Sequence, residues 1–400
     1  MIRLRLKPEE AIHLGFILKK KDKDGSNPKY SLDNNQSTEL AKFRNKERPL
    51  GQYSATDNLG NMLTVEEVCE MHGLDFSTVV EAKLVAHTKR KAYNIKFKFD
   101  NVLEEDKLSV DLIKSVLSKD YPSIPLAPNK TSSKTCDRLV MTDIHVGMDP
   151  NPEGTDMYNQ QWDKKTLFHD LKIILNKIQS LKTSDTIIIE DLGDFLDGWS
   201  KQTTRGGHNL PQNMTNIEMF QTGVEFKLCL LSSLSVLYDR VILYQVNNDN
   251  HAGDFASIVN YTVKLKAESS IENVEVHNMD KFMSHYKIGK HVNIISHGKD
   301  KIHMKTGMKP FMGPAEKEKI SVYIDMEVNK GKYIRFAKGD SHQYITDFSS
   351  SHKFSYHNYP AMSPGSGYVT TNFKPGLRGV VFESFEINRR SISVTPIWLN

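Results

Sequence analysis

Cysteine is scarce in this chain, and its spacing excludes two kinds of protein. The three cysteines among 400 residues, Cys69, Cys136 and Cys229, are far apart in the sequence. Disulfide frameworks and thiolate zinc sites need several cysteines at short spacings, so neither is expected here. The sequence also lacks any run of about 18 apolar residues, and MIRLRLKPEE (1–10) lacks the apolar core of a signal peptide. We therefore expect a cytoplasmic protein that does not associate with membranes.

The length and charge indicate a globular protein with two or three domains. Apolar residues make up 38% of the 400 positions and charged residues 26%, as in ordinary folded chains. Residues 1–135 hold 23 Lys and Arg against 19 Asp and Glu, whereas residues 136–400 hold 30 of each. The whole net charge of +4 therefore lies N-terminally and permits a polyanionic partner there. No dimer interface is recognisable in the sequence, which leaves open whether the protein forms a homo-oligomer.

The N-terminal third begins with a polar region and continues with a segment of helical periodicity. Residues 1–62 are rich in turn-forming residues, and we expect them to be partly flexible. In the segment 63–100, Thr64 and Glu67 have the spacing of a capping box, which predicts a helix of about ten residues. Ser77 can cap a second helix with an apolar stripe from Val79 to Val85. With the strand-like YNIKFKF (93–99), this layout resembles a small winged helix-turn-helix domain.

The basic residues of this segment are candidate nucleic-acid contacts. They are Lys83, Lys89, Arg90, Lys91, Lys96 and Lys98. Clustered lysines and arginines can neutralise the phosphates of DNA, which is the partner expected from this interpretation. The competing interpretation is an ordinary helical hairpin whose lysines only solvate its surface.

A helix and a linker are expected between this module and a larger domain. Periodicity predicts a helix over 107–118, and the Pro- and Ser-rich stretch 121–135 is typical of a linker, so residues 101–135 form one connecting region. Residues 136–400 alternate short β-branched runs with amphipathic segments, which predicts an α/β layered domain. The last two apolar runs, GLRGVVFESFEI and SISVTPIWL, have no helix between them and are expected to be antiparallel strands.

Five apolar runs of this domain each end in polar residues that can bind a metal. The runs are RLVM (138–141), TIIIE (186–190), VILYQV (241–246), VNIIS (292–296) and YIRFA (333–337). The polar residues that follow them are, in order, Asp143 and His145, Asp194 and Asp197, Asn250 and His251, His297, and Asp340 and His342. One such cluster is a weak signal, because a single His after a strand is usually structural. Five in series predict a crevice at the carboxyl edge of a sheet.

This mixture of carboxylate, imidazole and amide groups suits a pair of divalent cations. Two cations roughly 3.5–4 Å apart share a carboxylate, hold a phosphoryl group and lower the pKa of a bound water. Neutral imidazoles and hard oxygens favour manganese, iron, zinc or magnesium over calcium. An imidazole beside the cations can act as general acid toward the leaving oxygen.

The ordered motifs Asp-x-His, Gly-Asp-x-x-Asp, Asn-His, His and Gly-x-x-His, over residues 138–345, resemble those of the calcineurin-like metallophosphoesterase superfamily. The resemblance implies a layered β-sandwich flanked by helices. It also implies a first metal bound by Asp143, His145 and His342, a bridging Asp194, and a second metal bound by Asn250, His297 and Asp340. In the same pattern His251 is the catalytic histidine and Asp197 supports the site.

Two of the motifs depart from the pattern of the family. Asp249 and Ala252 flank Asn250-His251, where the family has a glycine and an acidic residue. Asp340 replaces the family's first histidine in the last motif, and the added hard, negative ligand favours manganese or magnesium over zinc. Arg205 and His208, in the loop KQTTRGGHNL, and Lys299 are candidate phosphate contacts, although exposed loops with such residues are common.

Three functions fit the sequence. The first is a nuclease or other phosphodiesterase acting on DNA, in the manner of the superfamily's DNA-repair exonucleases, and the domain pairing resembles phosphoesterases encoded by bacteriophages. The second is a phosphomonoesterase or protein phosphatase, because the same metal core serves both reactions. The third is a non-catalytic nucleic-acid-binding subunit with a degenerate phosphoesterase fold.

Overall fold

The computed structural model describes residues 2–5, 29–32, 49–56, 62–71, 76, 79–87, 90–97, 108–126, 133–152, 160–247, 249–298, 310–328, 333–348, 351–366, 369 and 376–399. These residues belong to two compact units, Met1–Glu105 and Asp106–Asn400. None of the helices within the described ranges is long and apolar enough to cross a membrane.

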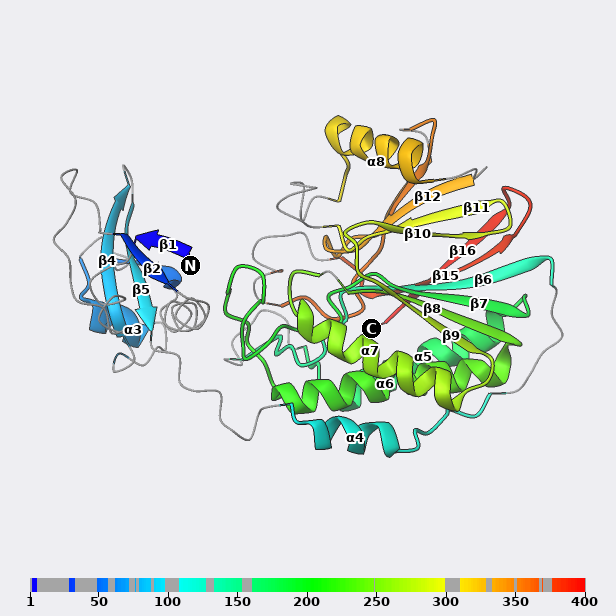
Figure 1. Ribbon diagram of the computed structural model, residues 1–400, viewed down its shortest axis with the longest axis horizontal. Helices are drawn as coiled ribbons and strands as arrows, with labels where there is room; N and C mark the ends of the chain where they lie inside the picture. The colour runs from blue at the N-terminus through cyan, green and yellow to red at the C-terminus, as the bar shows by residue number, and fades with distance from the viewer. Residues whose placement is uncertain are drawn as a thin grey trace. The chain divides into compact units, whose positions relative to one another are not determined.

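The first unit contains two small antiparallel sheets and a short helix among its described residues (Figure 1). One sheet pairs β1 (Ile2–Arg5) with β2 (Lys29–Leu32), and the other has the order β3 (Pro49–Ser54), β5 (Arg90–Phe97), β4 (Val79–His87). The helix α3 (Val65–Met71) begins at the predicted capping box. There the Thr64 N–H donates to Glu67 Oε2 at 2.7 Å, and the Glu67 N–H donates to Thr64 Oγ1 at 3.2 Å.

The prediction of a second helix for the helix-turn-helix is wrong, because a strand occupies that segment. β4 pairs with β5 from Val79 opposite Phe97 to His87 opposite Arg90. The apolar residues of VVEAKLVAH fit the period of a helix as well as that of a strand. Pairing with the neighbouring segment, which is rich in β-forming residues, favours a β-hairpin. Among the candidate nucleic-acid contacts, Lys83 is exposed on β4, and Arg90, Lys91 and Lys96 lie on β5. Lys89 and Lys98 lie outside the described residues.

The second unit confirms the predicted α/β class, because two packed sheets form its centre. The six-stranded sheet has the order β16 (Ile392–Trp398), β15 (Gly379–Glu386), β6 (Thr135–Met141), β7 (Thr186–Asp191), β8 (Arg240–Val246), β9 (Val274–Met279). The five-stranded sheet has the order β10 (Ser284–Ile288), β11 (His291–Ile295), β12 (Tyr333–Lys338), β14 (Ser355–Asn358), β13 (Ile345–Asp347). The last two strands are antiparallel, as the sequence predicts.

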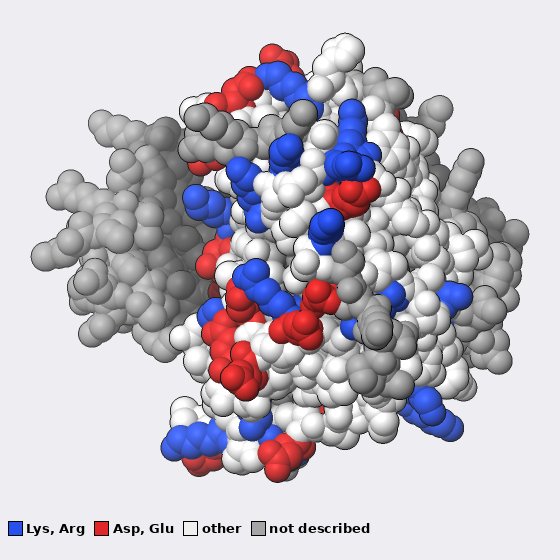
Figure 2. Space-filling view, turned by 90° about the vertical axis from the view of Figure 1, so that its right-hand side faces the viewer, with Lys and Arg blue, Asp and Glu red and all other residues white. Residues whose placement is uncertain are grey.

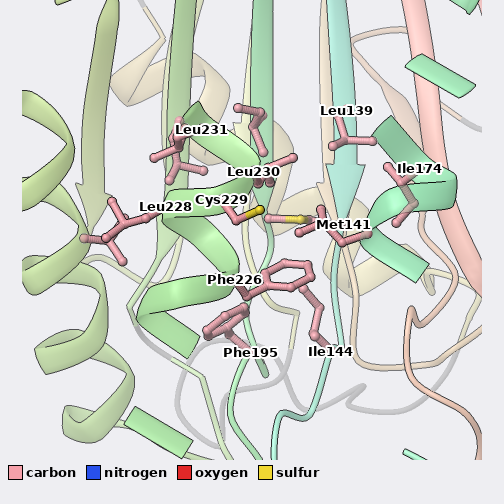
Figure 3. Packing of buried hydrophobic residues seen from close by; sticks show 14 of the residues in the cluster. Leu139, Met141, Ile144, Ile174, Phe195, Phe226, Leu228, Cys229, Leu230 and Leu231 are labelled. Atoms are coloured by element: carbon pink, nitrogen blue, oxygen red, sulfur yellow. The ribbon is translucent and has the colours of Figure 1, made fainter. Parts of the chain in front are cut away.

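Helices cover the outer faces of both sheets (Figure 1). On the larger sheet these are α5 (Lys164–Leu181), α6 (Asn216–Leu237) and α7 (Asp254–Ser270), and on the smaller one α8 (Pro314–Glu327). The alternation of side chains along β6 fixes the layers, since Leu139 and Met141 join the core beneath the helices, whereas Val140 joins the core between the sheets. Figure 3 shows Leu139 and Met141 beside Ile174 of α5 and Phe226 of α6.

Residues 108–126, assigned above to the connecting region, contribute to the core of the second unit. The helix α4 (Val110–Ser118) is capped by Ser109, whose side chain accepts a hydrogen bond from the Leu112 N–H. Val116 and Leu126 are buried in the same apolar cluster as β6. The Ile124 N–H donates to Ser233 Oγ of α6 at 2.8 Å. The Pro-rich composition of 121–126 therefore marks an extended segment lying on the domain.

Candidate metal centre

The ends of parallel strands from both sheets bring the candidate ligands together. β6, β7 and β8 run parallel in one sheet, and β11 and β12 run parallel in the other. Three groups of side chains have ligand atoms that lie within 4.8 Å of one another. These groups are Asp143 with His145 and His342, His145 with Asp194 and His251, and Asp143 with Asp194 and His297. The described residues thus form one connected cluster of His and Asp groups that could hold metal ions.

Five of the candidate ligands have left-handed backbone conformations. Seven non-glycine residues of the described chain have positive φ, and five of them are Asp143 (50°), His145 (49°), Asp194 (46°), Asp340 (68°) and His342 (55°). This conformation costs an L-residue about 1–2 kcal/mol, and strained residues of this kind cluster at functional sites. Backbone hydrogen bonds hold it in place, from the Asp143 N–H to the Gly193 oxygen and from the His145 N–H to the Asp194 oxygen, each at 3.0 Å. The surrounding fold therefore fixes the turns before any cation binds.

Asp143 is held so that one of its two carboxylate oxygens is free for a cation. Oδ2 accepts hydrogen bonds from the Thr142 hydroxyl at 2.7 Å and from the Asp340 N–H at 3.0 Å. Oδ1 is buried, has no hydrogen-bond partner among the described residues, and lies 3.4 Å from His342 Nε2 and 4.0 Å from His145 Nε2. These are the three side chains that the family resemblance assigns to the first metal.

Asp194 lies between two sets of imidazoles. Its Oδ2 is 3.0 Å from His297 Nε2 and 3.7 Å from His251 Nε2, while Oδ1 accepts the His251 N–H at 3.2 Å. Asp194 also shares one of the candidate groups with His145 and another with Asp143. A carboxylate with neighbours on both sides has the position that a bridging ligand needs.

The orientation of three imidazoles is set by groups on the Nδ1 side of each ring. His297 Nδ1 lies 3.0 Å from the Leu192 carbonyl oxygen, so Nδ1 carries the proton and Nε2 is left to face Asp194 as a ligand. Asp197 Oδ1 lies 3.1 Å from His145 Nδ1 and 3.4 Å from His251 Nδ1. Asp197 therefore has the place of a supporting carboxylate between two histidines.

The remaining candidate ligands are buried and partly unpaired. Among the described residues, the Asn250 side-chain oxygen and Asp340 Oδ2 have no hydrogen-bond partner. Asp340 Oδ1 lies 3.7 Å from His297 Nε2, which itself faces Asp194. Each buried polar atom left without a partner costs roughly 1–3 kcal/mol, and a cation would satisfy several at once. The donor set of carboxylate, amide oxygen and imidazole fits a divalent cation of intermediate hardness.

In this cluster the imidazoles lower the pKa values of the carboxylates, and the carboxylates raise the pKa values of the imidazoles. Burial opposes ionisation of Asp143 and Asp194, but His342 lowers the pKa of Asp143 and His251 lowers that of Asp194. Burial also opposes protonation of His297 and His251, yet Asp194 raises their pKa values to about 10 and about 9. The cation-free cluster therefore holds protons on its histidines, and metal binding should release them.

Two further residues shape the site and were not recognised as such in the sequence. Asp249 Oδ1 accepts the N–H groups of Ala252 at 2.9 Å and Gly253 at 3.0 Å, which closes the turn before α7. Burial, followed by repulsion from Asp194, raises the pKa of Asp249 to about 6. The second is Gly339, where a Cβ would lie 2.0 Å from Thr142 Oγ1. In the sequence, Asp249 stood out only as a replacement for the glycine of the family pattern.

The candidate phosphate contacts have mixed outcomes. The loop 201–210 packs through its backbone on the turn that carries Asn250 and His251. The Thr204 N–H donates to the His251 oxygen at 2.7 Å, and the Arg205 N–H donates to the Asn250 oxygen at 3.3 Å. Arg205 is half-buried and, with Asp249, lines a cavity of about 490 Å³, whereas His208 is exposed. Lys299 lies outside the described residues.

Comparisons with known proteins do not assign this chain to a family, so its functional assignment depends on the residues of the site. No family model matches the sequence, and no curated protein is significantly similar to it. Among solved structures, a candidate 5′-nucleotidase from Staphylococcus aureus, crystallised with alpha-ketoglutarate, is similar with a TM-score of 0.32 and 11% identity. The similarity covers 66% of this chain and 55% of that one, so this chain spans just over half the length of that structure.

Replacing Gly339 by alanine should weaken metal binding without unfolding the protein. A Cβ at this position would lie 2.0 Å from Thr142 Oγ1 and 2.7 Å from Asp143 Oδ2, so the Asp143 carboxylate must move. We expect affinity for Mn²⁺, measured by isothermal titration calorimetry, to fall about 10–100-fold, as for other losses of ligand positioning. Gly313→Ala is the matched control, because its nearest neighbour is the flexible end of Glu316. Equal affinities of the two variants would contradict this account of Asp143.

Proposed function

We propose that this protein is a metal-dependent hydrolase of phosphate esters. The observation that carries the proposal is the convergence of Asp143, Asp194 and His297, whose ligand atoms lie within 4.8 Å of one another at the end of two packed sheets. Buried, unpaired oxygen and nitrogen atoms in the same cluster favour cations as its natural occupants. The ordered motifs of the sequence support the same reaction class.

Two divalent cations would occupy the cluster. Asp143, His145 and His342 would hold the first, Asn250, His297 and Asp340 the second, and Asp194 would lie between them. When bound, the cations would polarise the phosphoryl group and supply an activated water. The number of oxygen ligands favours Mn²⁺, with Mg²⁺, Fe²⁺ and Zn²⁺ as the other metals to compare.

His251 is positioned to supply a proton to the leaving oxygen. Its side chain is 19% exposed, whereas those of His145 and His297 are 4% and 1% exposed, so a substrate can reach it. In the cation-free site, Asp194 and then Asp197 raise its pKa to about 9, although burial opposes protonation. Asp197 also holds the ring from its Nδ1 side. A positioned imidazolium is the general acid that ester hydrolysis requires.

As the more specific proposal, the ester is a phosphodiester of DNA. Support comes from the charge excess of residues 1–135, 23 basic against 19 acidic, and from the exposed Lys83 on β4. The proposal no longer draws on a recognition helix. A phosphomonoesterase or protein phosphatase is the alternative, since the same metal core serves both.

A paired substrate assay tests this proposal. Full-length protein with Mn²⁺ should cleave plasmid or single-stranded DNA and should prefer bis-p-nitrophenyl phosphate to p-nitrophenyl phosphate. His251→Gln should lower kcat on DNA about 10²–10⁴-fold at unchanged metal content. The loss should be smaller on the nitrophenyl ester, whose leaving group needs little protonation.

A control variant and two opposing outcomes complete the substrate assay. His277→Gln, on the exposed edge strand β9, should leave kcat unchanged. Preference for the monoester would favour the phosphatase. Absence of hydrolysis with all four metals, together with no stoichiometric metal, would favour a non-catalytic nucleic-acid-binding subunit.

A further inference from the structure

A network of buried charged groups lies between the two sheets, away from the metal centre. Arg138 of β6 donates from Nε to Glu383 Oε2 at 2.8 Å and from Nη1 to the Asn293 side-chain oxygen at 2.6 Å. Arg335 of β12 donates to the same Asn293 oxygen at 3.1 Å and pairs with Glu190. Arg138, Asn293 and Arg335 are 2%, 1% and 5% exposed. The two guanidinium groups are therefore fixed in place by two carboxylates and a shared amide.

These residues line a cavity that opens at the end of the sheets where β11 and β12 begin. The cavity has a volume of about 100 Å³, several times the roughly 10–15 Å³ that one water needs on this measure. Its wall includes Arg138, Asn293, Arg335, His357, Lys353 and Arg390. Among the described residues that line it there is neither Asp nor Glu. A cavity with this wall offers many hydrogen-bond donors and no ionised acceptor.

Two of the lining side chains are buried with unpaired polar atoms. The Asn293 oxygen accepts from both arginines, which fixes the orientation of the amide, and its Nδ2 has no partner in the part of the chain that the structure describes. His357 is 1% exposed, with Nε2 at 3.0 Å from Ser355 Oγ, and its Nδ1 likewise has no partner among the described residues. Burial lowers the pKa of His357 to about 3, so the ring is neutral and can donate from Nδ1 while Nε2 accepts from the serine.

We propose that this cavity binds a phosphate group, either as inorganic phosphate or as part of a small nucleotide. Arg138 donates three hydrogen bonds, to Glu383 and Asn293, and Arg335 donates four, to Asn293, Tyr359 and Glu190. An arginine has five N–H donors, so at least one on each is left without an acceptor among the described residues. Asn293 Nδ2 and His357 Nδ1 add two donors, and all four side chains line the cavity. A tetrahedral oxyanion has enough acceptor oxygens to meet them, whereas a carboxylate has two.

Arg390 adds a further positive charge to the cavity wall. Arg390 and Lys353 are exposed and belong to the lining, but Lys353 forms an ion pair with Asp325. Figure 2 shows the end of the molecule at which the β15–β16 turn lies, where basic and acidic side chains are interspersed. The outer surface of this end therefore does not favour anions by itself, and selectivity comes from the cavity wall.

The site is separate from the metal centre. His291 lies in the cavity wall at the first residue of β11, and His297 lies just beyond the other end of that strand. Six residues of extended chain span about 20 Å. Phosphate binding in the cavity can therefore be measured while the metal centre is disabled.

Calorimetric titration of full-length protein with inorganic phosphate, with a chelator present and at constant ionic strength, tests the proposal. We expect saturable binding in the wild type and in Asp194→Asn, whose change lies in the metal centre. Asn293→Asp keeps the oxygen that both arginines need and replaces the unpaired donor by a negative oxygen. It should weaken phosphate binding at least about tenfold.

A second variant and a second ligand complete the test. Arg390→Gln changes an exposed side chain and should weaken binding several-fold even if Asn293→Asp does not fold. A deoxynucleoside monophosphate that binds more tightly than phosphate would identify a nucleotide as the source, and equal affinity would identify free phosphate. No saturable binding in the wild type, or binding lost in Asp194→Asn but kept in Arg390→Gln, would overturn the proposal.

Discussion

Asp194→Asn should abolish phosphoester hydrolysis and reduce the bound metal. Asp194 has His297 Nε2 at 3.0 Å and His251 Nε2 at 3.7 Å from the same oxygen, and it shares separate groups with His145 and Asp143. An amide of the same shape keeps the fold but removes the charge that two cations would share. We expect kcat to fall at least about a thousandfold, because both cations of the proposed pair would depend on this ligand. Hydrolysis of the bis-ester and metal content by mass spectrometry measure the two effects.

Asp239→Asn provides the matched control for this change. Asp239 is an exposed aspartate just before β8, at the opposite end of the larger sheet from Asp194. Its replacement should alter neither kcat nor metal content. If Asp194→Asn kept two equivalents of metal and full activity, the carboxylate would not bridge the cations.

Glu383→Gln should be strongly destabilising at neutral pH and much less so in acid. Glu383 is fully buried against Arg138, and removing one partner of such a pair leaves the other charge uncompensated, at roughly 3–5 kcal/mol. Burial opposes ionisation of Glu383, but Arg138 and Arg335 lower its pKa from 4.5 to about 2. Since the folded-state pKa is the lower one, this stabilisation is present above pH 4.5 and is lost as the pH falls toward 2.

Urea denaturation at pH 7 and pH 3 measures this dependence. The shift of Glu383 corresponds to about 3 kcal/mol, more than half of which should be absent at pH 3. The exposed pair of Glu275 with Arg240, at 2.8 Å, supplies the control, and Glu275→Gln should change the free energy of unfolding by less than about 1 kcal/mol. A Glu383→Gln effect that was equal at both pH values would show that packing, not charge, stabilises this region.

The order of the candidate ligands could be predicted from the sequence because each lies just beyond a short apolar run. Parallel strands end at one edge of a sheet, so local patterns were enough to place Asp143 and Asp194 near each other. The functional roles of these residues stay predictions. The Arg138–Glu383 pair could not be foreseen, because its partners are 245 residues apart and a charge within a strand is usually exposed.

Two segments of the N-terminal third differ from what their composition suggests, and for the same reason. The residues of β4 have apolar spacing that suits a helix as well as a strand, and only pairing with β5 distinguishes them. The stretch around Leu126 has the composition of a linker, yet Leu126 is 8% exposed in the main core. In both segments the outcome depends on what lies opposite in space, which composition does not reveal.

The candidate metal centre is divided between two sheets. Asp143, Asp194 and His251 follow strands of the larger sheet, whereas His297, Asp340 and His342 follow strands of the smaller one. Neither sheet alone carries all the candidate ligands, so bound cations would link the two sheets to each other. Separation of the sheets would release the metal, and the release rate would therefore report how often the sandwich opens.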